Sequence, residues 1–209
     1  MIKLENTQTL NWEAAVRGMR NPMNSWDKSD SGFVRGDMFI GENDLSLMKK
    51  LVKAGSDHRK FMRQIFVSVD ITAPLYWWKE FDTYKVGTVA NSCSTMHKIH
   101  EKEFTLDDFS CEYLADRWEN AGTFKYCLIA VIAHLNHARE KYIETKDKFF
   151  WWQMIQLLPS SYNQKRTVTL NYENLFNMYH ARKNHKLDEW RTLCKWIESL
   201  PYAKELIGE

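Results

Sequence analysis

Two short segments of the chain alternate apolar and polar residues with the period of a β-strand. In residues 65–72 (IFVSVDIT) isoleucine or valine occupies every second position, and residues 165–171 (KRTVTLN) alternate in the same way. This period is typical of a strand with one buried face. Because two long strands are too few to stand alone, we expect further strands, with residues 33–40 as the candidate.

Longer stretches repeat apolar residues at spacings of three and four. The strongest such pattern covers residues 124–142 and predicts an amphipathic helix. Residues 43–54 carry a similar stripe, which begins at Asn43 as a plausible N-cap and stops at Gly55. We expect further helices at 11–20, 75–84, 105–118, 148–158, 173–183 and 187–200, and loops at 24–37 and 86–95. The pattern predicts an α+β fold, a helix-rich single domain over residues 1–209 with a small antiparallel sheet.

Composition narrows the range of functions. The chain has 209 residues, of which 44% are hydrophobic, so it can bury a stable core without disulfide bonds or a structural metal ion. Its formal net charge is only +2, which argues against a nucleic-acid partner. It has no apolar run long enough to span a membrane and no apolar signal core at its N-terminus, so we expect a cytoplasmic protein with no membrane partner.

Several common sites lack their markers in this chain. The dinucleotide-binding, P-loop and hydrolase glycine motifs do not occur, and neither does a C-x-x-C pair. Two histidine pairs, at 97/100 and 134/137, have the i,i+3 spacing of helical metal ligands. Di-metal sites in helical bundles also need Glu-x-x-His motifs, and none is present. We therefore predict no metal site.

The most informative stretch is the one that follows the first predicted strand. After Pro74 comes a short aromatic helix and then a loop rich in Gly, Ser and Asn, an order typical of a scaffold that carries a ligand loop. Near the C-terminus, residues 158–184 (LPSSYNQKRTVTLNYENLFNMYHARKN) contain a second ordered set of polar and apolar positions. Together with the helix and strand that precede Pro74, these segments resemble the flavin-dependent thymidylate synthases, also called thymidylate synthase-complementing proteins.

The C-terminal segment is similar to the family's L-P-x-x-x-x-T-x-x-x-x-x-N-x-R-x-L-x-N-F-L-x-L-R. The matching positions are Pro159, Asn171, Leu175, Asn177 and Arg182. Two positions depart from the family. Glu173 stands where the family has an arginine on the flavin, and Ile155 stands where it has an arginine on the nucleotide phosphate.

The central segment, residues 74–95, is similar to the family signature P-I-F-V-x-R-Q-x-x-R-H-R-x-x-S-x-N-E-x-S-x-R-Y. With one inserted residue, Asn91 and Ser94 match its Asn and Ser. Most of its charged positions are replaced. The replacements are Lys79 and Glu80 for Arg-Gln, Thr83, Tyr84 and Lys85 for Arg-His-Arg, and Ser92, Met96 and His97 for Glu, Arg and Tyr.

The resemblance implies a fold, an activity and a set of ligands. Members transfer a methylene group from methylenetetrahydrofolate to dUMP, use FAD reduced by NADPH, need no protein nucleophile, and form homotetramers. Carried over by position, the resemblance implies contacts to a pyrimidine deoxynucleotide from Arg182, Ser94, Asn91 and Glu80. It implies contacts to FAD from Arg63, Thr83, Tyr84, Lys85 and Asn177, and it implies no catalytic side chain.

Structural roles compete with these assignments. Arg182 suits a helix C-terminus without any ligand, because cations are favoured there. Ser94 and Asn91 suit ordinary loop capping, and Tyr84 suits packing at a helix end. Three hypotheses therefore stay open: a divergent flavin-dependent methyltransferase with altered anchoring residues, a non-catalytic nucleotide-binding paralogue, and an interaction module that uses the aromatic residues and the basic segment 182–186.

Overall fold

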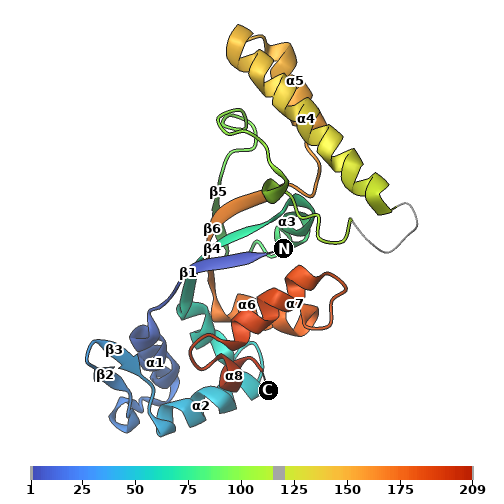
Figure 1. The fold of residues 1–209 in the computed structure, drawn as a ribbon. Helices are drawn as coiled ribbons and strands as arrows, with labels where there is room; N and C mark the ends of the chain where they lie inside the picture. The colour runs from blue at the N-terminus through green and yellow to red at the C-terminus, as the bar shows by residue number, and fades with distance from the viewer. Residues whose placement is uncertain (1, 115–120, 209) are drawn as a thin grey trace. The chain divides into compact units, whose positions relative to one another are not determined.

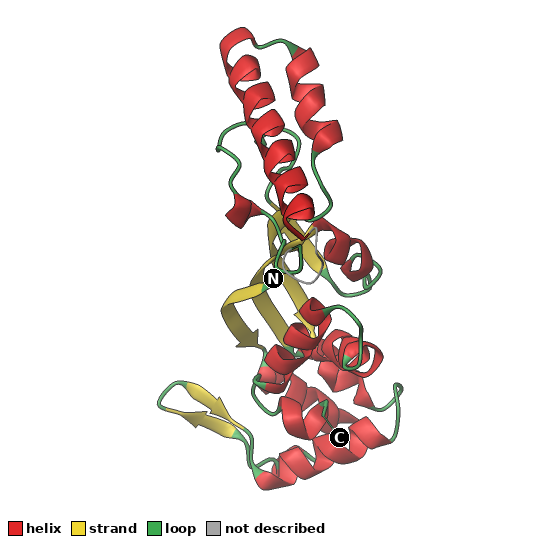
Figure 2. Cartoon of the chain, turned by 45° about the vertical axis from the view of Figure 1, so that its right-hand side comes forward, coloured by secondary structure: helices red, strands yellow, loops and turns green. Residues whose placement is uncertain are grey.

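The computed structural model describes residues 2–114 and 121–208. Within them the chain is helix-rich with small sheets, which confirms the predicted α+β class (Figures 1 and 2). No helix in the described part is both long and apolar enough to cross a membrane.

A four-stranded sheet has the strand order β1-β4-β6-β5. Its central strands β4 and β6 are antiparallel, because Tyr172 N donates to Ile65 O and Leu75 N donates to Tyr162 O, each at 3.0 Å. The alternation predicted for residues 65–72 is confirmed, since the isoleucines and valines of β4 are buried and the residues between them are not. The strands are β1 (Lys3–Leu10), β4 (Phe66–Pro74), β5 (Val89–Ser92) and β6 (Asn163–Asn171).

The chain divides into two compact units, and the backbone passes from one to the other within β1, β4, β5 and β6 and once after α3 (Leu75–Phe81). The first unit consists of Met1–Lys3, Ile71–Thr83 and Asn91–Arg166, and the second of Leu4–Asp70, Tyr84–Ala90 and Thr167–Glu209. The single domain expected over residues 1–209 stays a prediction.

The first unit is built around a helical hairpin. Helices α4 and α5 run side by side (Figure 1), and their facing apolar residues, such as Leu135 and Met154, are buried together with Phe104 and Phe109 from the preceding segment. Asp147 separates the two helices and caps α5, because its side chain accepts from Phe149 N at 2.9 Å. The helices are α3 (Leu75–Phe81), α4 (Ala121–Thr145) and α5 (Lys148–Leu157).

The second unit packs its helices around a core of aromatic and methionine side chains. The ring of Trp12 meets that of Tyr172 edge-on at 5.1 Å, and Tyr172 Oη donates to Pro201 O at 2.6 Å. A separate hairpin of β2 and β3 projects from this unit (Figure 2). The elements are α1 (Trp12–Arg20), β2 (Gly32–Val34), β3 (Asp37–Phe39), α2 (Glu42–Lys53), the 3-10 helix η3 (Arg59–Gln64), α6 (Tyr172–Arg182), α7 (Asp188–Glu198) and α8 (Ala203–Leu206).

Three predictions from the sequence pattern need correction. The loop expected at 24–37 contains β2 and part of β3. Both strands overlap residues 33–40, where further strands were expected. The loop expected at 86–95 contains the short strand β5. The helix expected at 105–118 is only one 3-10 turn, η4 (Leu106–Asp108), and its residues 115–118 lie outside the described part. Phe109 is extended there and forms a β-bridge with Tyr162, which ends the turn.

Candidate functional site

In the first unit, a chain of polar contacts fixes the segment that follows β5. Gln164 Nε2 donates to Cys93 O at 2.7 Å, and Cys93 N donates to Lys165 O at 2.9 Å. The Gln164 side chain is held in turn, because Arg166 Nε donates to its Oε1 at 3.0 Å. Trp78 Nε1 donates to Gln164 O at 3.0 Å. The loop after β5 is therefore anchored on β6, to which α3 is also hydrogen-bonded.

Arg166 also contacts α3 directly. Its guanidinium lies over the ring of Trp78, 4.1 Å from the centroid, and its NH1 donates to Asp82 Oδ1 at 2.7 Å. A cation above an indole face is attracted by the ring quadrupole. Arg166 thus links the end of α3 to β6.

Four of the predicted ligand residues belong to this unit. Asn91 and Thr83 are exposed, whereas Glu80 and Ser94 are half-buried. Thr83 Oγ1 donates to Glu80 O at 2.7 Å, which closes the end of α3. Ser94 Oγ accepts from His97 N at 2.8 Å and from Met96 N at 3.3 Å. Ser94 therefore caps its own loop, which is the structural role weighed for it from the sequence, and its oxygen already accepts two hydrogen bonds.

In the second unit, a cluster of charged side chains surrounds Glu173 in the first turn of α6. Arg59 Nε donates to Glu173 Oε1 at 3.3 Å, and Arg63 makes a two-pronged contact that includes NH2 to Oε1 at 3.2 Å. Both arginines come from η3, four residues apart. Arg59 is further fixed by stacking over the Phe176 ring at 4.2 Å.

This cluster stays ionised and keeps a positive excess. Burial opposes ionisation of Glu173, but the hydrogen bonds and charges of Arg63 and Arg59 outweigh it and lower the pKa of the carboxyl. Two guanidinium groups on one carboxylate give these three groups a net charge of +1, and the carboxylate of Asp57 also acts on Arg63 by its charge. The Arg63 side chain is 49% exposed, against 13% for Glu173. The excess positive charge therefore faces solvent.

Arg182, at the end of α6, lies among aromatic rings. Its Nε donates to Tyr84 Oη at 3.0 Å, and its guanidinium lies 4.8 Å from the centroid of the Trp190 ring. Tyr84 and Trp190 also contact each other edge-on at 5.9 Å. Two predicted ligand residues, Arg182 and Tyr84, are thus brought together, and each holds the other in place.

The remaining predicted residues, Lys85 and Asn177, are exposed on the loop before β5 and on α6. That loop is tied to the start of α6, because Asn174 Nδ2 donates to Val86 O at 2.6 Å. Gly87 has φ of +72°, and a Cβ there would lie 2.8 Å from Asn171 Nδ2. Only glycine fits this close approach without strain.

Two arginines that organise these clusters, Arg59 and Arg166, are not among the residues that the resemblance assigns to a ligand. The i,i+4 spacing of Arg59 with Arg63 is visible in the sequence. No sequence signal pairs Arg166 with Trp78 and Asp82. Across the described residues, no group of three or more His, Cys, Asp or Glu side chains is placed to hold a metal ion.

Comparison with known proteins extends over nearly the whole chain. Two structures of the flavin-dependent thymidylate synthase of Helicobacter pylori, complexed with FAD and dUMP, superpose with TM-scores of 0.70 and 0.71 at 16% identity. They cover 98% and 99% of this chain, and 97% of the other chain in each case. This chain has the fold of the flavin-dependent thymidylate synthases. The resemblance seen in the sequence is therefore confirmed at the level of the fold.

A methylase shares this thymidylate synthase fold. The UMP/dUMP methylase PolB from Streptomyces cacaoi, bound with 5-Br dUMP, superposes with a TM-score of 0.61 at 14% identity, covering 95% of this chain and 88% of that one. No protein-family model and no curated protein sequence matches the chain.

Proposed function

We propose that this protein is a divergent flavin-dependent thymidylate synthase-like enzyme that methylates dUMP or a related pyrimidine deoxynucleotide. Its one-carbon donor would be methylenetetrahydrofolate, and its reductant would be NADPH acting through FAD. The fold is shared with a synthase complexed with FAD and dUMP and with a dUMP methylase. The observation that carries the proposal is the Arg59–Glu173–Arg63 cluster, which supplies net positive charge where the resemblance puts a flavin-contacting arginine.

The cluster fits the anionic part of a flavin dinucleotide. A diphosphate needs exposed hydrogen-bond donors with a positive field, and guanidinium groups supply both. Arg63 is half exposed, and Glu173 fixes both arginines while cancelling only one of their two positive charges. The N-terminus of α6, where Glu173 lies, adds the positive end of a helix dipole. When bound, the reduced flavin would supply the hydride that completes the methyl group.

The protein itself would then orient the two ligands and neutralise the charge of their phosphates. In the second unit, Arg63, with Arg59 behind it, would hold the flavin phosphates, and further flavin contacts would come from Tyr84, Lys85 and Asn177. The resemblance also assigns a flavin contact to Thr83 and nucleotide contacts to Asn91, Ser94 and Glu80 in the first unit. It assigns a nucleotide contact to Arg182 in the second unit. Lysine keeps the charge of a missing arginine but loses its two-pronged geometry. We therefore expect weaker phosphate binding than a full arginine set would give.

One observation favours the alternative of a nucleotide-binding protein without flavin chemistry. Arg182, the best candidate for a nucleotide contact, already donates to Tyr84 and stacks on Trp190, and Ser94 already caps its loop. Ligand anchoring would then need these contacts to be exchanged.

The deciding experiment is a visible absorbance spectrum of the purified protein, with and without added FAD and dUMP. A flavin band that co-purifies, or that shifts when dUMP is added, supports the enzyme. A colourless protein that ignores FAD but binds dUMP in calorimetry supports the alternative. A protein that binds neither ligand contradicts both hypotheses.

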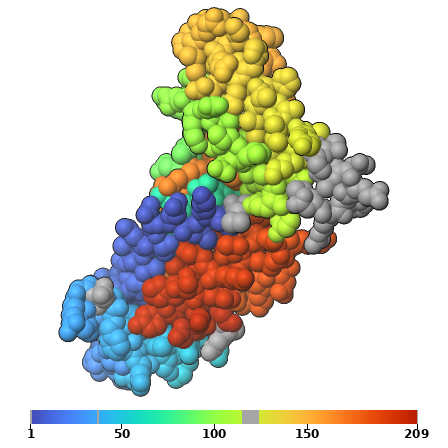
Figure 3. Space-filling view, in the orientation of Figure 1, coloured from blue at the N-terminus to red at the C-terminus, as the bar shows by residue number. Residues whose placement is uncertain are grey.

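The proposal includes self-association, as the resemblance to homotetramers implies. Helices α4 and α5 bury one seam but leave large apolar side chains exposed on their outer surface, which Figure 3 draws in yellow and orange. Helices that are apolar on more than one face are normally covered. The exposed residues include Phe124, Ile129, Phe149 and Trp152. Light scattering should show an oligomer that Phe149→Ser with Trp152→Ser weakens, and a monomeric wild type would refute this part.

A further inference from the structure

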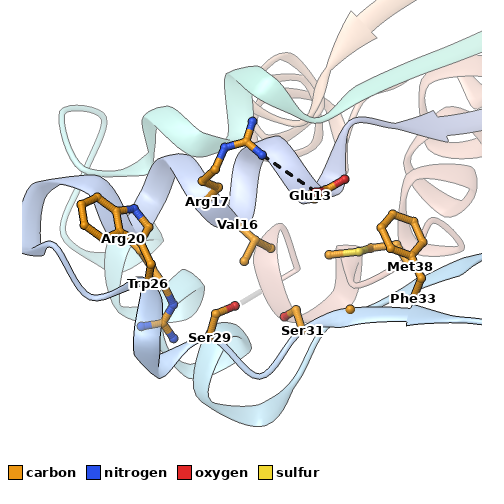
Figure 4. A pocket seen from close by; sticks show the side chains of 10 residues that line it. Glu13, Val16, Arg17, Arg20, Trp26, Ser29, Ser31, Phe33 and Met38 are labelled. Atoms are coloured by element: carbon orange, nitrogen blue, oxygen red, sulfur yellow. Dashed lines mark ion pairs between the residues drawn. The ribbon is translucent and has the colours of Figure 1, made fainter.

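A cavity of about 310 Å³ opens in the second unit between α1 and the β2–β3 hairpin (Figure 4). Trp26 stands on one side of it and Phe33 and Met38 stand on the other, with Val16 of α1 between them. These side chains give the cavity mainly apolar walls. None of its lining residues was assigned to a ligand from the sequence, and the function proposed above does not use it.

A buried arginine lines the same cavity. Arg20 is only 4% exposed, and its Nε donates to Asp44 Oδ1 at 2.6 Å. One amino group, NH1, donates to Ser25 O at 3.1 Å and is 3.5 Å from Ser25 Oγ. The second amino group, NH2, makes no hydrogen bond with any described residue. NH2 is not one of the fully buried side-chain atoms that lack a partner, so it has access to open space, where an occupant of the cavity can supply an acceptor.

The charges around the cavity cancel. Asp44 is fully buried, and its Oδ2 accepts from the hydroxyls of Ser29 and Ser31 at 2.7 and 2.6 Å. Burial raises the pKa of its carboxyl, but these hydrogen bonds and Arg20 outweigh that effect and lower it, so the pair is ionised. At the rim, Arg17 NH1 lies 3.9 Å from Glu13 Oε1. Two cations and two carboxylates give no net attraction for an anion.

We propose that this cavity binds a small, flat, uncharged aromatic molecule that carries a carbonyl group, of the aromatic carboxamide class. The ring packs between Trp26 and Phe33, where aromatic and thioether contacts are favourable. The carbonyl oxygen accepts a hydrogen bond from Arg20 NH2, and a charged donor makes that bond strong. The volume is at the small end for ligand sites, which suits one or two fused rings rather than a nucleotide.

The test uses the full chain and three probes of similar shape in ligand-detected NMR. Benzamide has the ring and the neutral carbonyl, benzoate has the ring and a negative charge, and toluene has the ring alone. We expect benzamide to bind more tightly than benzoate. No benzamide binding up to its solubility limit, or equal or tighter binding of benzoate, would overturn the proposal.

A matched pair of variants places the site. Phe33 and Val34 are neighbours on β2 and are 61% and 60% exposed, but only Phe33 lines the cavity. Phe33→Ser should weaken benzamide binding about fivefold by loss of an aromatic wall. Val34→Ser should leave it unchanged. Equal effects of the two substitutions would overturn the site.

Arg20→Lys tests the hydrogen bond, because lysine keeps a positive charge for Asp44 but removes the guanidinium amino group. Benzamide binding should weaken while toluene binding stays the same, and unchanged benzamide binding would overturn the role of Arg20. Chemical denaturation reports whether this variant is folded. If it is not, the comparison of Phe33→Ser with Val34→Ser still decides the proposal.

Discussion

Two arginine–carboxylate clusters in the second unit use the same chemical groups in opposite ways. Asp44 is fully buried and meets one arginine, Arg20, while hydroxyls and backbone N–H groups fill its second oxygen. Glu173 is partly exposed and meets two arginines, Arg59 and Arg63. The first cluster is neutral and the second has a net charge of +1.

The two clusters differ in the donors that satisfy the remaining acceptor positions of the carboxylate. Neutral donors satisfy Asp44 without adding charge, so its cluster ties the segment Ser29–Ser31 to α2 and has a structural role. At Glu173 the donors are charged guanidinium groups, and the half-exposed Arg63 presents the remaining positive charge to solvent. Substitutions in the first cluster should therefore change stability, and those in the second should change ligand binding.

The largest expected effect is on stability, at Asp44. Asp44→Ala leaves Arg20 as an uncompensated buried charge, and breaking a buried pair in this way costs about 3–5 kcal/mol. Urea denaturation measures the loss in the free energy of unfolding. Glu13→Ala, which removes the exposed pair with Arg17, is the control and should cost less than about 1 kcal/mol. If the two variants lose the same stability, the Asp44 cluster is not structural.

The next effect is on flavin binding, at Arg63. Arg63→Ala removes one charge-assisted contact and should weaken FAD binding about tenfold. The free energy of unfolding should change little, because the side chain is half exposed. Quenching of flavin fluorescence on titration gives the affinity. Lys204→Ala, which removes the same charge from an exposed position on α8, should leave FAD affinity unchanged, and an equal loss there would point to non-specific attraction.

A smaller effect of opposite sign is expected at Glu173. Glu173→Gln keeps the shape of the side chain but raises the net charge of the cluster, so FAD should bind a few-fold more tightly at low salt. The gain should shrink as ionic strength rises, because the group is near the surface. Weaker binding in this variant would mean that the carboxylate matters more for orienting the arginines than for its charge.

The smallest effect is on the pH dependence of stability. The pKa values of Asp44 and Glu173 are lowered in the folded state from their ordinary values of 3.8 and 4.5. The unfolded chain therefore binds protons first, so this part of the stability is present above about pH 5 and is lost as the pH falls through the folded pKa values. Denaturation at several acidic pH values should show a shallower decline for Glu173→Gln. An unchanged slope would mean that Glu173 is not stabilised by its arginines.

Local pattern predicted some elements well and others badly. The strands β4 and β6 and the helices α4 and α5 follow their apolar periodicity, because each buries one continuous face. Residues 109–114 also looked helical from Thr105 onward, but the bridge between Phe109 and Tyr162 draws that segment into extended backbone. The strands β1 and β5 were not predicted, since most of their residues are polar and exposed and pairing with β4 and β6 holds them.

The candidate site was likewise predicted only in part from the sequence. The sequence alone supported the resemblance, named Arg63 and Arg182 as cations of interest, and showed that Glu173 replaces an expected arginine. A carboxylate by itself in that place would repel an anionic ligand. The structure instead pairs Glu173 with two arginines more than a hundred residues away in the chain.

The sequence by itself determined the class of fold, the order of the main elements and the absence of the common catalytic motifs. These follow from periodicity and from residue types at fixed spacings, which are local properties of the chain. Only the tertiary structure decided which charges neutralise one another, that Arg182 rests on Tyr84 and Trp190, and that Arg20 has an unused donor beside a cavity. Electrostatic pairing depends on distance in space, and segments that lie far apart in the sequence supply the partners.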